Sequence, residues 1–203
     1  MDWQRCYADR TTPWDLRQPT PPLIALIESG RLPRFGLAEA GAVAVPGCGR
    51  GHDLRVWAGA GYRATGFDVV PEVVEEARAL LAWNQTVGAQ VLCRDILGLA
   101  DEFSAAFDAI YDYTCFCALP PHLRGAYGQE MTAITAVGGL WLGLAFPLDP
   151  GRAGIDGPPY LIRPGDLIDA LAPGFELIED FAAERSVPQR RAAERWFVFR
   201  RQG

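Results

Sequence analysis

The feature of this sequence that most constrains its fold is a short apolar run that ends in a glycine-rich turn. Residues 42–45 read Ala-Val-Ala-Val, and residues 46–51 read Pro-Gly-Cys-Gly-Arg-Gly. A run that is apolar at every position is typical of a parallel strand buried on both faces. The glycines permit a tight turn and the close approach of a ligand, and a helix that starts after them offers free N–H groups to an anion. The sequence therefore predicts an α/β fold with a ligand site at the carboxyl end of its first strand.

The rest of the chain alternates between strand and helix patterns, with Gly and Pro between the segments. Five alternations predict a parallel sheet with helices on both faces. The last two strands have no helical pattern between them, which predicts an antiparallel C-terminal hairpin. We therefore expect a Rossmann-like, doubly wound, seven-stranded sheet in a single domain, residues 1–203. The expected strands are 42–45, 64–68, 90–93, 107–111, 140–145, 175–178 and 196–200, and the expected helices are 23–27 (capped by Thr20), 54–60, 71–81, 121–136 and 164–172.

Acidic residues at the ends of the second and third strands indicate which ligand binds. Asp68 stands 17 residues after Gly51, where a carboxylate accepts hydrogen bonds from both ribose hydroxyls of a nucleoside. Asp95 can accept from an adenine amino group and Ile96 can cover the ring, although Asp95 is also suited to capping a turn. The spacing G-x-G-x-G differs from the G-x-G-x-x-G of dinucleotide sites. These features predict S-adenosyl-L-methionine (SAM) as cofactor and S-adenosyl-L-homocysteine as product, with a nicotinamide oxidoreductase as the weaker alternative.

Composition favours a small-molecule partner. The net charge is −6 and no basic run is present, which argues against binding nucleic acid or an anionic membrane. The five cysteines are odd in number and the N-terminus has no apolar leader, so we expect a reducing, cytoplasmic location. Cys115 and Cys117 lack a second Cys/His pair at a zinc-like spacing, so we expect no metal. Nothing in the sequence indicates oligomerisation, and we favour a monomer.

Several segments carry motifs of a known family. They are Trp3-x-x-x-Tyr7, Thr12-Pro13-Trp14-Asp15, Pro19-Thr20-Pro21, residues 45–51 and Gly157-Pro158-Pro159-Tyr160. Together they resemble the thiopurine methyltransferase superfamily, whose members are class I SAM-dependent methyltransferases. Residues 111–119, Tyr-Asp-Tyr-Thr-Cys-Phe-Cys-Ala-Leu, are more similar to its thiol, thiocyanate and halide methyltransferase branch.

This resemblance implies that residues 1–30 form an arm and a helix that cover the active site. On this basis Trp3 and Tyr7 pack against SAM, and Trp14 lies beside the methyl acceptor. Simple core packing is the alternative for each of these aromatic residues. The complete set of expected cofactor-binding residues is Trp3, Tyr7, Gly47, Cys48, Gly49, Asp68, Asp95, Ile96 and Tyr113.

The expected acceptor-binding residues are Trp14, Tyr113 and Tyr160. Thiopurine enzymes of the family carry Arg after the Asp that ends strand four, and this chain has Tyr113 there, which argues against thiopurine substrates. The hydroxyls of Tyr113 and Tyr160 are suited to a small anion or thiolate. Tyr160 is equally suited to packing under the Pro/Gly-rich loop at residues 147–159.

The chemistry expected is direct, in-line methyl transfer to a small soft nucleophile: a thiol, bisulfide, thiocyanate or halide. Such acceptors need little or no deprotonation, so a general base is optional. We expect His52 and His122 to be structural, and a methylated cysteine intermediate to be less favourable than direct transfer. The alternatives are a thiopurine-type or natural-product O-, N- or S-methyltransferase, and a SAM-binding sensor or scaffold without catalysis.

Overall fold

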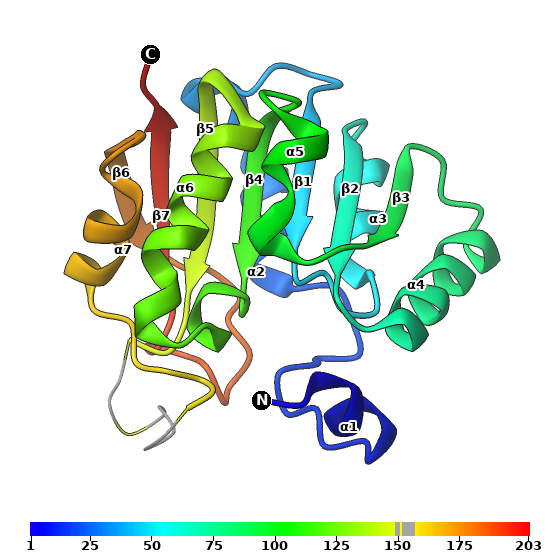
Figure 1. Ribbon diagram of the computed structural model, residues 1–203. Coiled ribbons are helices and arrows are strands. Elements are labelled where there is room, and N and C mark those ends of the chain that lie inside the picture. The colour runs from blue at the N-terminus through cyan, green and yellow to red at the C-terminus, as the bar shows by residue number, and fades with distance from the viewer. Residues whose placement is uncertain (149–150, 152–156) are drawn as a thin grey trace.

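The computed structural model describes residues 1–148, 151 and 157–203, and shows a sheet covered by helices on both faces (Figure 1). The strands are β1 (Ala42–Pro46), β2 (Arg63–Asp68), β3 (Ala89–Cys93), β4 (Phe107–Tyr113), β5 (Thr135–Ala145), β6 (Phe175–Ala182) and β7 (Arg195–Arg201). The α-helices are α1 (Trp3–Ala8), α2 (Pro21–Glu28), α3 (His52–Gly59), α4 (Pro71–Trp83), α5 (Ala100–Phe103), α6 (Arg124–Ile134) and α7 (Pro164–Leu171). Short 3₁₀ helices are η1 (Leu32–Phe35), η2 (Ile96–Gly98), η3 (Phe116–Ala118) and η4 (Pro121–Leu123).

The seven strands are arranged in the order β3-β2-β1-β4-β5-β7-β6. The first five are parallel, while β7 runs antiparallel to both β5 and β6. The predicted doubly wound sheet with an antiparallel C-terminal hairpin is thereby confirmed. The strand order reverses at β1, whose two neighbours are β2 and β4, and open α/β sheets bind ligands at that point, beyond the carboxyl ends of the strands.

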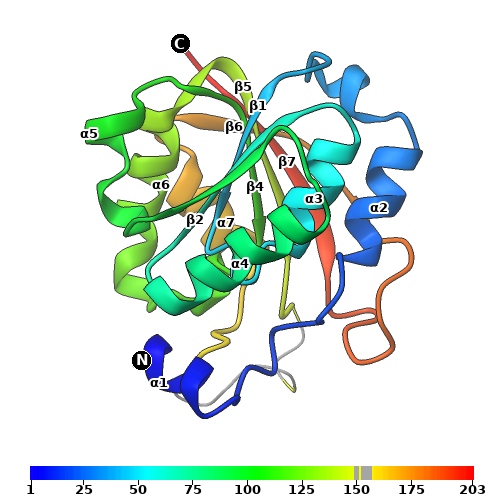
Figure 2. The ribbon, with the colours of Figure 1, turned by 90° about the vertical axis from the view of Figure 1, so that its right-hand side faces the viewer.

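Two apolar clusters hold the helices on opposite faces of the sheet (Figure 2). On one face, α2, α3 and α4 pack side chains such as Leu23, Trp57 and Val74, which are essentially inaccessible to solvent. On the other face, α6 and α7 contribute Tyr127 and Leu167. None of the helices in the described part of the chain is long and apolar enough to cross a bilayer.

The sequence placed most elements within a few residues, but the predicted helix 121–136 was too long. Residues 121–123 form η4, α6 ends at Ile134, and β5 already begins at Thr135. Thr135 has an extended backbone and is paired with Phe107, and an irregularity in the β4–β5 register follows it. Gly138 has a φ of +81°. Gly138 and Gly139 therefore lie within the irregular strand β5 and do not terminate the preceding helix.

Two details near the N-terminus also differ from expectation. Residues 3–8 form the short helix α1, which no apolar pattern indicated and which begins where Asp2 accepts a hydrogen bond from the backbone N–H of Arg5. Thr20 occupies the N-cap position of α2 as predicted, but its side chain makes no capping hydrogen bond. Its hydroxyl instead donates to Asp53, 2.7 Å away. The side chain thus fixes the entry to α2 against α3.

Candidate functional site

The glycine turn after β1 is built from three residues with left-handed backbones. Gly47, Gly49 and Gly51 have φ values of +60°, +51° and +75°, a region that other L-residues adopt at a cost. A Cβ on Gly47 would lie 3.0 Å from the sulfur of Cys115, and one on Gly49 would lie 3.1 Å from the hydroxyl of Tyr7. The turn therefore needs glycine both for its conformation and for the close approach of its neighbours.

Asp68 lies directly beside this turn, at the carboxyl end of β2. Its Oδ2 accepts a hydrogen bond from the backbone N–H of Gly49 at 2.9 Å, and its Oδ1 accepts one from Val70 at 3.1 Å. Burial raises the pKa of Asp68, while these backbone hydrogen bonds lower it. Each carboxylate oxygen keeps a further lone pair for an outside donor. A nucleoside with two ribose hydroxyls fits this arrangement, as SAM requires.

Asp95 and Ile96 lie beyond β3, next to the carboxyl end of β2. The register pairs Asp68 with Cys93, two residues before Asp95. The side chain of Asp95 accepts a hydrogen bond from the N–H of Leu97 at 2.9 Å, so it caps η2. One of the two uses that the sequence left open is therefore observed, and the predicted contact of Asp95 with adenine stays a prediction.

The N-terminal arm (residues 1–20) lies across the carboxyl ends of the parallel strands (Figure 1). Its aromatic residues form a cluster. Trp14 meets Trp3 and Tyr7 edge to face, with ring centroids 5.5 and 5.8 Å apart. The indole N–H of Trp14 donates to the hydroxyl of Tyr7 at 3.3 Å. The structure thus brings together the three aromatic residues for which the resemblance implied a site role.

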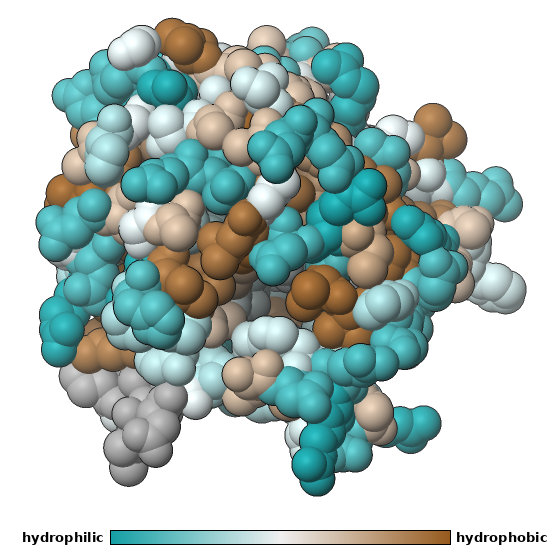
Figure 3. Space-filling view, viewed as in Figure 1, coloured by the Kyte–Doolittle hydropathy of each residue, from teal (hydrophilic) through white to brown (hydrophobic). Residues whose placement is uncertain are grey.

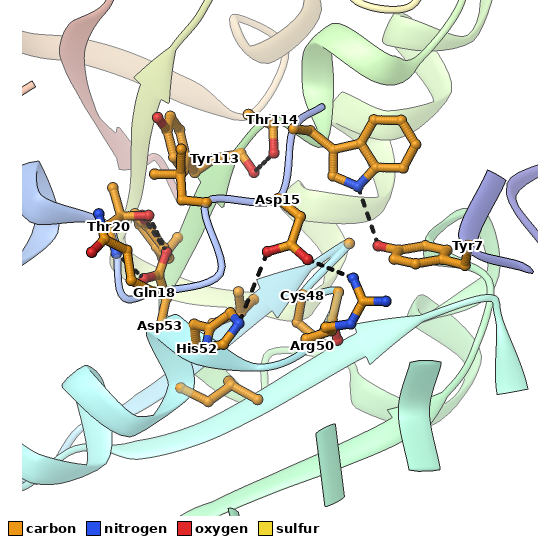
Figure 4. Close-up of a pocket in the computed structure, with 17 residues that line it drawn as sticks. Tyr7, Asp15, Gln18, Thr20, Cys48, Arg50, His52, Asp53, Tyr113 and Thr114 are labelled. Carbon is orange, nitrogen blue, oxygen red and sulfur yellow. Dashed lines mark hydrogen bonds and ion pairs between the residues drawn. The ribbon is translucent and has the colours of Figure 1, made fainter. Parts of the chain in front are cut away.

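Charged residues attach the arm to the glycine turn (Figure 4). The guanidinium of Arg50 pairs with Asp15 of the arm and with Glu76 of α4. It also lies 5.2 Å from the centre of the Tyr7 ring. His52 Nε2 is 3.9 Å from Asp15 Oδ1, and burial lowers the pKa of His52. This Arg50 clasp, formed by Asp15, Arg50 and Glu76, closes the arm over the turn.

A cavity of about 80 Å³ lies under the arm, between the glycine turn and the carboxyl end of β4. Trp14 and Leu16 of the arm line it together with Cys48, Tyr111 and Tyr113. Figure 3 shows apolar side chains around a hollow on this side of the molecule. Polar side chains, Asp15, Arg50 and His52 among them, also line the cavity. The walls therefore combine aromatic and apolar side chains with polar ones, and the glycine turn lies at one end.

The half-buried carboxylate of Asp53 fixes one wall of the cavity. It accepts hydrogen bonds from the N–H and hydroxyl of Thr20, both at 2.7 Å, and from the hydroxyl of Tyr111 at 2.9 Å. Burial raises the pKa of Asp53 and these hydrogen bonds oppose the rise. Asp53 lies in the first turn of α3, where acidic residues are common, and nothing in the sequence around it indicates these distant partners.

Tyr113 borders the cavity, but its hydroxyl is already used. It donates to Glu194 Oε2 at 3.0 Å, and the guanidinium of Arg190 lies 4.9 Å from its ring centre. Arg190 also donates to the backbone carbonyl of Trp14 at 2.7 Å. Sequence reasoning missed Arg190 and Glu194, since only their spacing of four residues sets them apart. The expected role of Tyr113 with the acceptor remains a prediction.

Tyr160 lies apart from this group. Its N–H donates to the carbonyl of Cys117 at 2.7 Å, and its ring fills the space where Gly157 would carry a side chain. Within the described residues it does not line the cavity that contains Trp14 and Tyr113. Part of the predicted loop at residues 147–159, namely 149–150 and 152–156, lies outside the described residues. Of the three expected acceptor-binding residues, the structure brings together Trp14 and Tyr113.

Cys115 and Cys117 follow β4 and are buried. Burial raises the pKa of Cys117 to about 12 and that of Cys115 well above its ordinary value. Because the thiolate is the nucleophilic form, both thiols are poor nucleophiles. This favours direct transfer over a methylated cysteine.

The chain is similar to known proteins over most of its length. Residues 1–201 match the family described as thiopurine S-methyltransferase (TPMT). Probable thiol methyltransferase 2 of Arabidopsis thaliana is 33% identical, over 95% of this chain and 81% of that protein. Thiopurine S-methyltransferase of Pseudomonas putida (strain GB-1) is 29% identical, over 87% of this chain and 84% of that protein.

The fold is also found among solved structures. The 1,6-didemethyltoxoflavin-N1-methyltransferase of Burkholderia thailandensis, solved with S-adenosylhomocysteine, superimposes with a TM-score of 0.76 and 20% identity. The match covers 100% of this chain and 86% of the other. At this identity the likeness concerns the fold alone.

Proposed function

Because the chain belongs to the thiopurine S-methyltransferase family and is a SAM-dependent methyltransferase, we propose that it methylates a small soft nucleophile. The acceptors proposed are a thiol, bisulfide, thiocyanate or halide. The observation that carries this proposal is the small, aromatic cavity between Trp14, the glycine turn and Tyr113. About 80 Å³ beside the end of the cofactor site suits an acceptor of only a few atoms.

The cofactor site is proposed from the same geometry. The backbone of Gly47, Cys48 and Gly49 faces the methionine part of SAM, and Asp68 accepts from the ribose hydroxyls. Asp95 and Ile96 bind the adenine, as their position after the third strand predicts. Trp3 and Tyr7 cover the cofactor from the arm, and Tyr113 borders its methyl end. SAM supplies an electrophilic methyl group, and the chain aligns the acceptor with it and excludes water.

The aromatic walls favour a polarisable nucleophile over a strongly hydrated one. Most side-chain donors that line the cavity already donate to partners within the protein, so an alcohol or amine would find few free partners there. They are Trp14, Thr20, Arg50, Tyr111, Tyr113 and Thr114. A sulfur or iodide acceptor loses less on leaving water. The names of the thiol methyltransferase relatives support the same acceptor class.

An acceptor screen tests this proposal. Purified protein and SAM are incubated with thiols, bisulfide, thiocyanate, iodide, a thiopurine, alcohols and amines, and S-adenosylhomocysteine is measured. Turnover with the sulfur or halide acceptors is expected. Exclusive turnover of an alcohol or amine would contradict it, and SAM binding without turnover of any acceptor would indicate a sensor or scaffold.

Tyr113→Phe tests whether the Tyr113 hydroxyl assists the acceptor. The variant keeps the ring and loses the bond to Glu194. We expect kcat/KM for thiols to fall about tenfold, with the SAM affinity changed less than about threefold. Unchanged kinetics would remove the hydroxyl from the mechanism.

A further inference from the structure

Two buried residues of opposite charge lie directly behind the proposed acceptor cavity. Arg190 and Glu194 lie in the segment just before β7, which begins at Arg195. Only 5% of the surface of Arg190 and 6% of that of Glu194 are exposed. Charged side chains are almost never buried to this degree unless every polar atom has a partner. These two residues do not meet that condition.

Arg190 is held tightly on three sides. Its guanidinium lies 4.9 Å from the ring centres of both Tyr113 and Phe146, and its Nη2 donates to the Trp14 carbonyl. Its Nη1 is buried without a hydrogen-bond partner among the described residues. Because this guanidinium contacts Trp14 and Tyr113, which line the cavity, its charge is suited to stabilise an anion there.

Glu194 shows the complementary pattern. Its Oε2 accepts from the Tyr113 hydroxyl at 3.0 Å. Its Oε1 is also buried and lacks a hydrogen-bond partner in the part of the chain that the structure describes. Leaving such atoms unsatisfied is costly, so a free acceptor on Glu194 and a free donor on Arg190 indicate a use.

We propose that Glu194 is the general base for protic acceptors, acting through the hydroxyl of Tyr113, and that the positive charge of Arg190 stabilises the resulting anion, an inference that rests on the proposed function. The S–H bond of a bound thiol breaks and its proton passes to the hydroxyl of Tyr113, a residue that lines the cavity. That hydroxyl gives its own proton to Glu194 Oε2, to which it is already hydrogen-bonded. The sulfur uses a lone pair to form the bond to the methyl carbon. The bond between that carbon and the sulfonium sulfur breaks, and its electron pair remains on that sulfur. The products are a thioether, S-adenosylhomocysteine and a protonated Glu194, which returns its proton to water.

The surroundings of Glu194 support this role. Burial raises its pKa, while the hydroxyls of Ser186 and Tyr113 and the charge of Arg190 lower it. The charged and titratable groups that act on Glu194 in the described structure are thus Arg190 and Tyr113. A carboxylate with a raised pKa is a stronger base, closer to the pKa of a thiol. Tyr113 cannot itself be the final base, because burial raises the pKa of its phenol and keeps the hydroxyl protonated at neutral pH.

Acceptors without a proton provide the decisive comparison. Iodide and thiocyanate need no base, whereas a neutral thiol does. Glu194→Gln should lower kcat/KM for thiols at neutral pH by about 100- to 1,000-fold. It should leave kcat/KM for iodide and thiocyanate within about threefold of wild type. Raising the pH toward the thiol pKa should restore much of the thiol activity, because free thiolate replaces the base.

The matched control is Glu184→Gln, which removes an exposed carboxylate from the same segment and should leave all acceptors unaffected. An equal loss with thiol and iodide would assign Glu194 a structural role and overturn the proposal. Unchanged thiol kinetics in Glu194→Gln would overturn it too. If wild-type protein binds SAM but methylates none of these acceptors, the proposed function itself fails, which is a different result.

A binding measurement on the wild-type protein does not depend on any variant folding. Thiol binding to the protein with S-adenosylhomocysteine is followed by calorimetry in two buffers of different ionisation enthalpy. If Glu194 keeps the thiol proton, the observed enthalpy should not depend on the buffer. A buffer-dependent enthalpy, which indicates proton release to solvent, would overturn the proposal.

Discussion

The two halves of the site differ in how they are built. The cofactor half comprises the glycine turn and Asp68, and its contacts are backbone hydrogen bonds between residues 19 positions apart or fewer. The acceptor half comprises Trp14, Tyr113, Arg190 and Glu194. Its contacts join side chains across 81 residues, from Tyr113 to Glu194, and a side chain to backbone across 176, from Arg190 to Trp14. The residues of the cofactor half therefore form a local sequence motif, whereas those of the acceptor half come together only in the folded chain.

The largest effect should come from removing the central carboxylate of the cofactor half. Asp68→Ala loses the acceptors for the ribose hydroxyls and frees the N–H of Gly49. Two hydrogen bonds to a charged group are together worth several kcal/mol, so SAM should bind at least about 100-fold more weakly. Calorimetric titration with SAM measures this. Asp101→Ala, on the exposed surface of α5, is the control, and a loss below about fivefold for Asp68→Ala would contradict the assignment.

A pH-dependent effect is expected at Asp112, the residue before Tyr113 of the acceptor half. Asp112 is buried at the end of β4, accepts from Tyr127 at 2.6 Å and from Phe116 N–H at 3.2 Å, and burial raises its pKa from 3.8 to about 6. Between these values the folded state binds more protons than the unfolded state. The stability due to Asp112 is therefore fully present below pH 3.8 and is lost as the pH rises through 6, by about 3 kcal/mol.

Urea unfolding of wild type and Asp112→Asn from pH 4 to 7 checks this. The variant cannot ionise, so the stability advantage of wild type should shrink as the pH rises. Parallel stability curves for the two proteins would show that Asp112 does not titrate in this range. A large effect here with unchanged SAM affinity would sharpen the distinction between the two halves.

A smaller effect should follow Gly49→Ala in the cofactor half. Its φ of +51° and the Tyr7 hydroxyl, 3.1 Å from the new Cβ, both oppose a side chain. We expect a loss of about 1–2 kcal/mol in stability and about tenfold weaker SAM binding, because Tyr7 must move. Thermal unfolding and SAM titration measure the two. Gly59→Ala in α3 has open space and should be neutral, so equal losses in the two variants would contradict the local explanation.

The smallest effect concerns the clasp that joins the arm to the turn. Arg50→Gln removes the pairs with Asp15 and Glu76, at a side chain that is 26% exposed. Partly exposed ion pairs contribute about 1 kcal/mol or less, so SAM should dissociate about three times faster. Stopped-flow displacement measures this, with Arg63→Gln as control. A larger increase in the dissociation rate would mean that the arm contributes more to SAM binding than its contacts with Arg50 indicate.

The sequence predicted the fold, the cofactor class and the position of the glycine turn well for a physical reason. Buried parallel strands, glycine turns and strand-end carboxylates act through nearby residues, so the pattern around Gly47 and Asp68 already contains most of the needed information. The failures were of another kind. Thr20 was assigned a local cap because its partner Asp53 lies 33 residues away, and Thr135 was assigned to a helix because its pairing with Phe107 is invisible along the chain.

The acceptor half could not be predicted in the same way. Trp14 and Tyr113 were identified through resemblance, whereas Arg190 and Glu194 lie in a polar segment that looks like a solvated loop. Nothing in one sequence marks a charged side chain as buried when its neighbours come from β4, from the residue after β5 and from the arm. Tyr160 is the opposite case, since this motif residue does not line the described cavity, and its expected role with the acceptor stays a prediction.

The hydrogen bond from Arg190 to the Trp14 carbonyl also affects the order in which the two halves of the site form during synthesis of the chain. A ribosome makes a protein from its N-terminus, and early segments begin to fold before late ones exist. The residues of the glycine turn and Asp68 are complete once residue 68 has been made. Trp14 is made earlier still, but it receives its partner Arg190 only after a further 122 residues have followed Asp68. The nascent chain therefore completes its acceptor half well after its cofactor half.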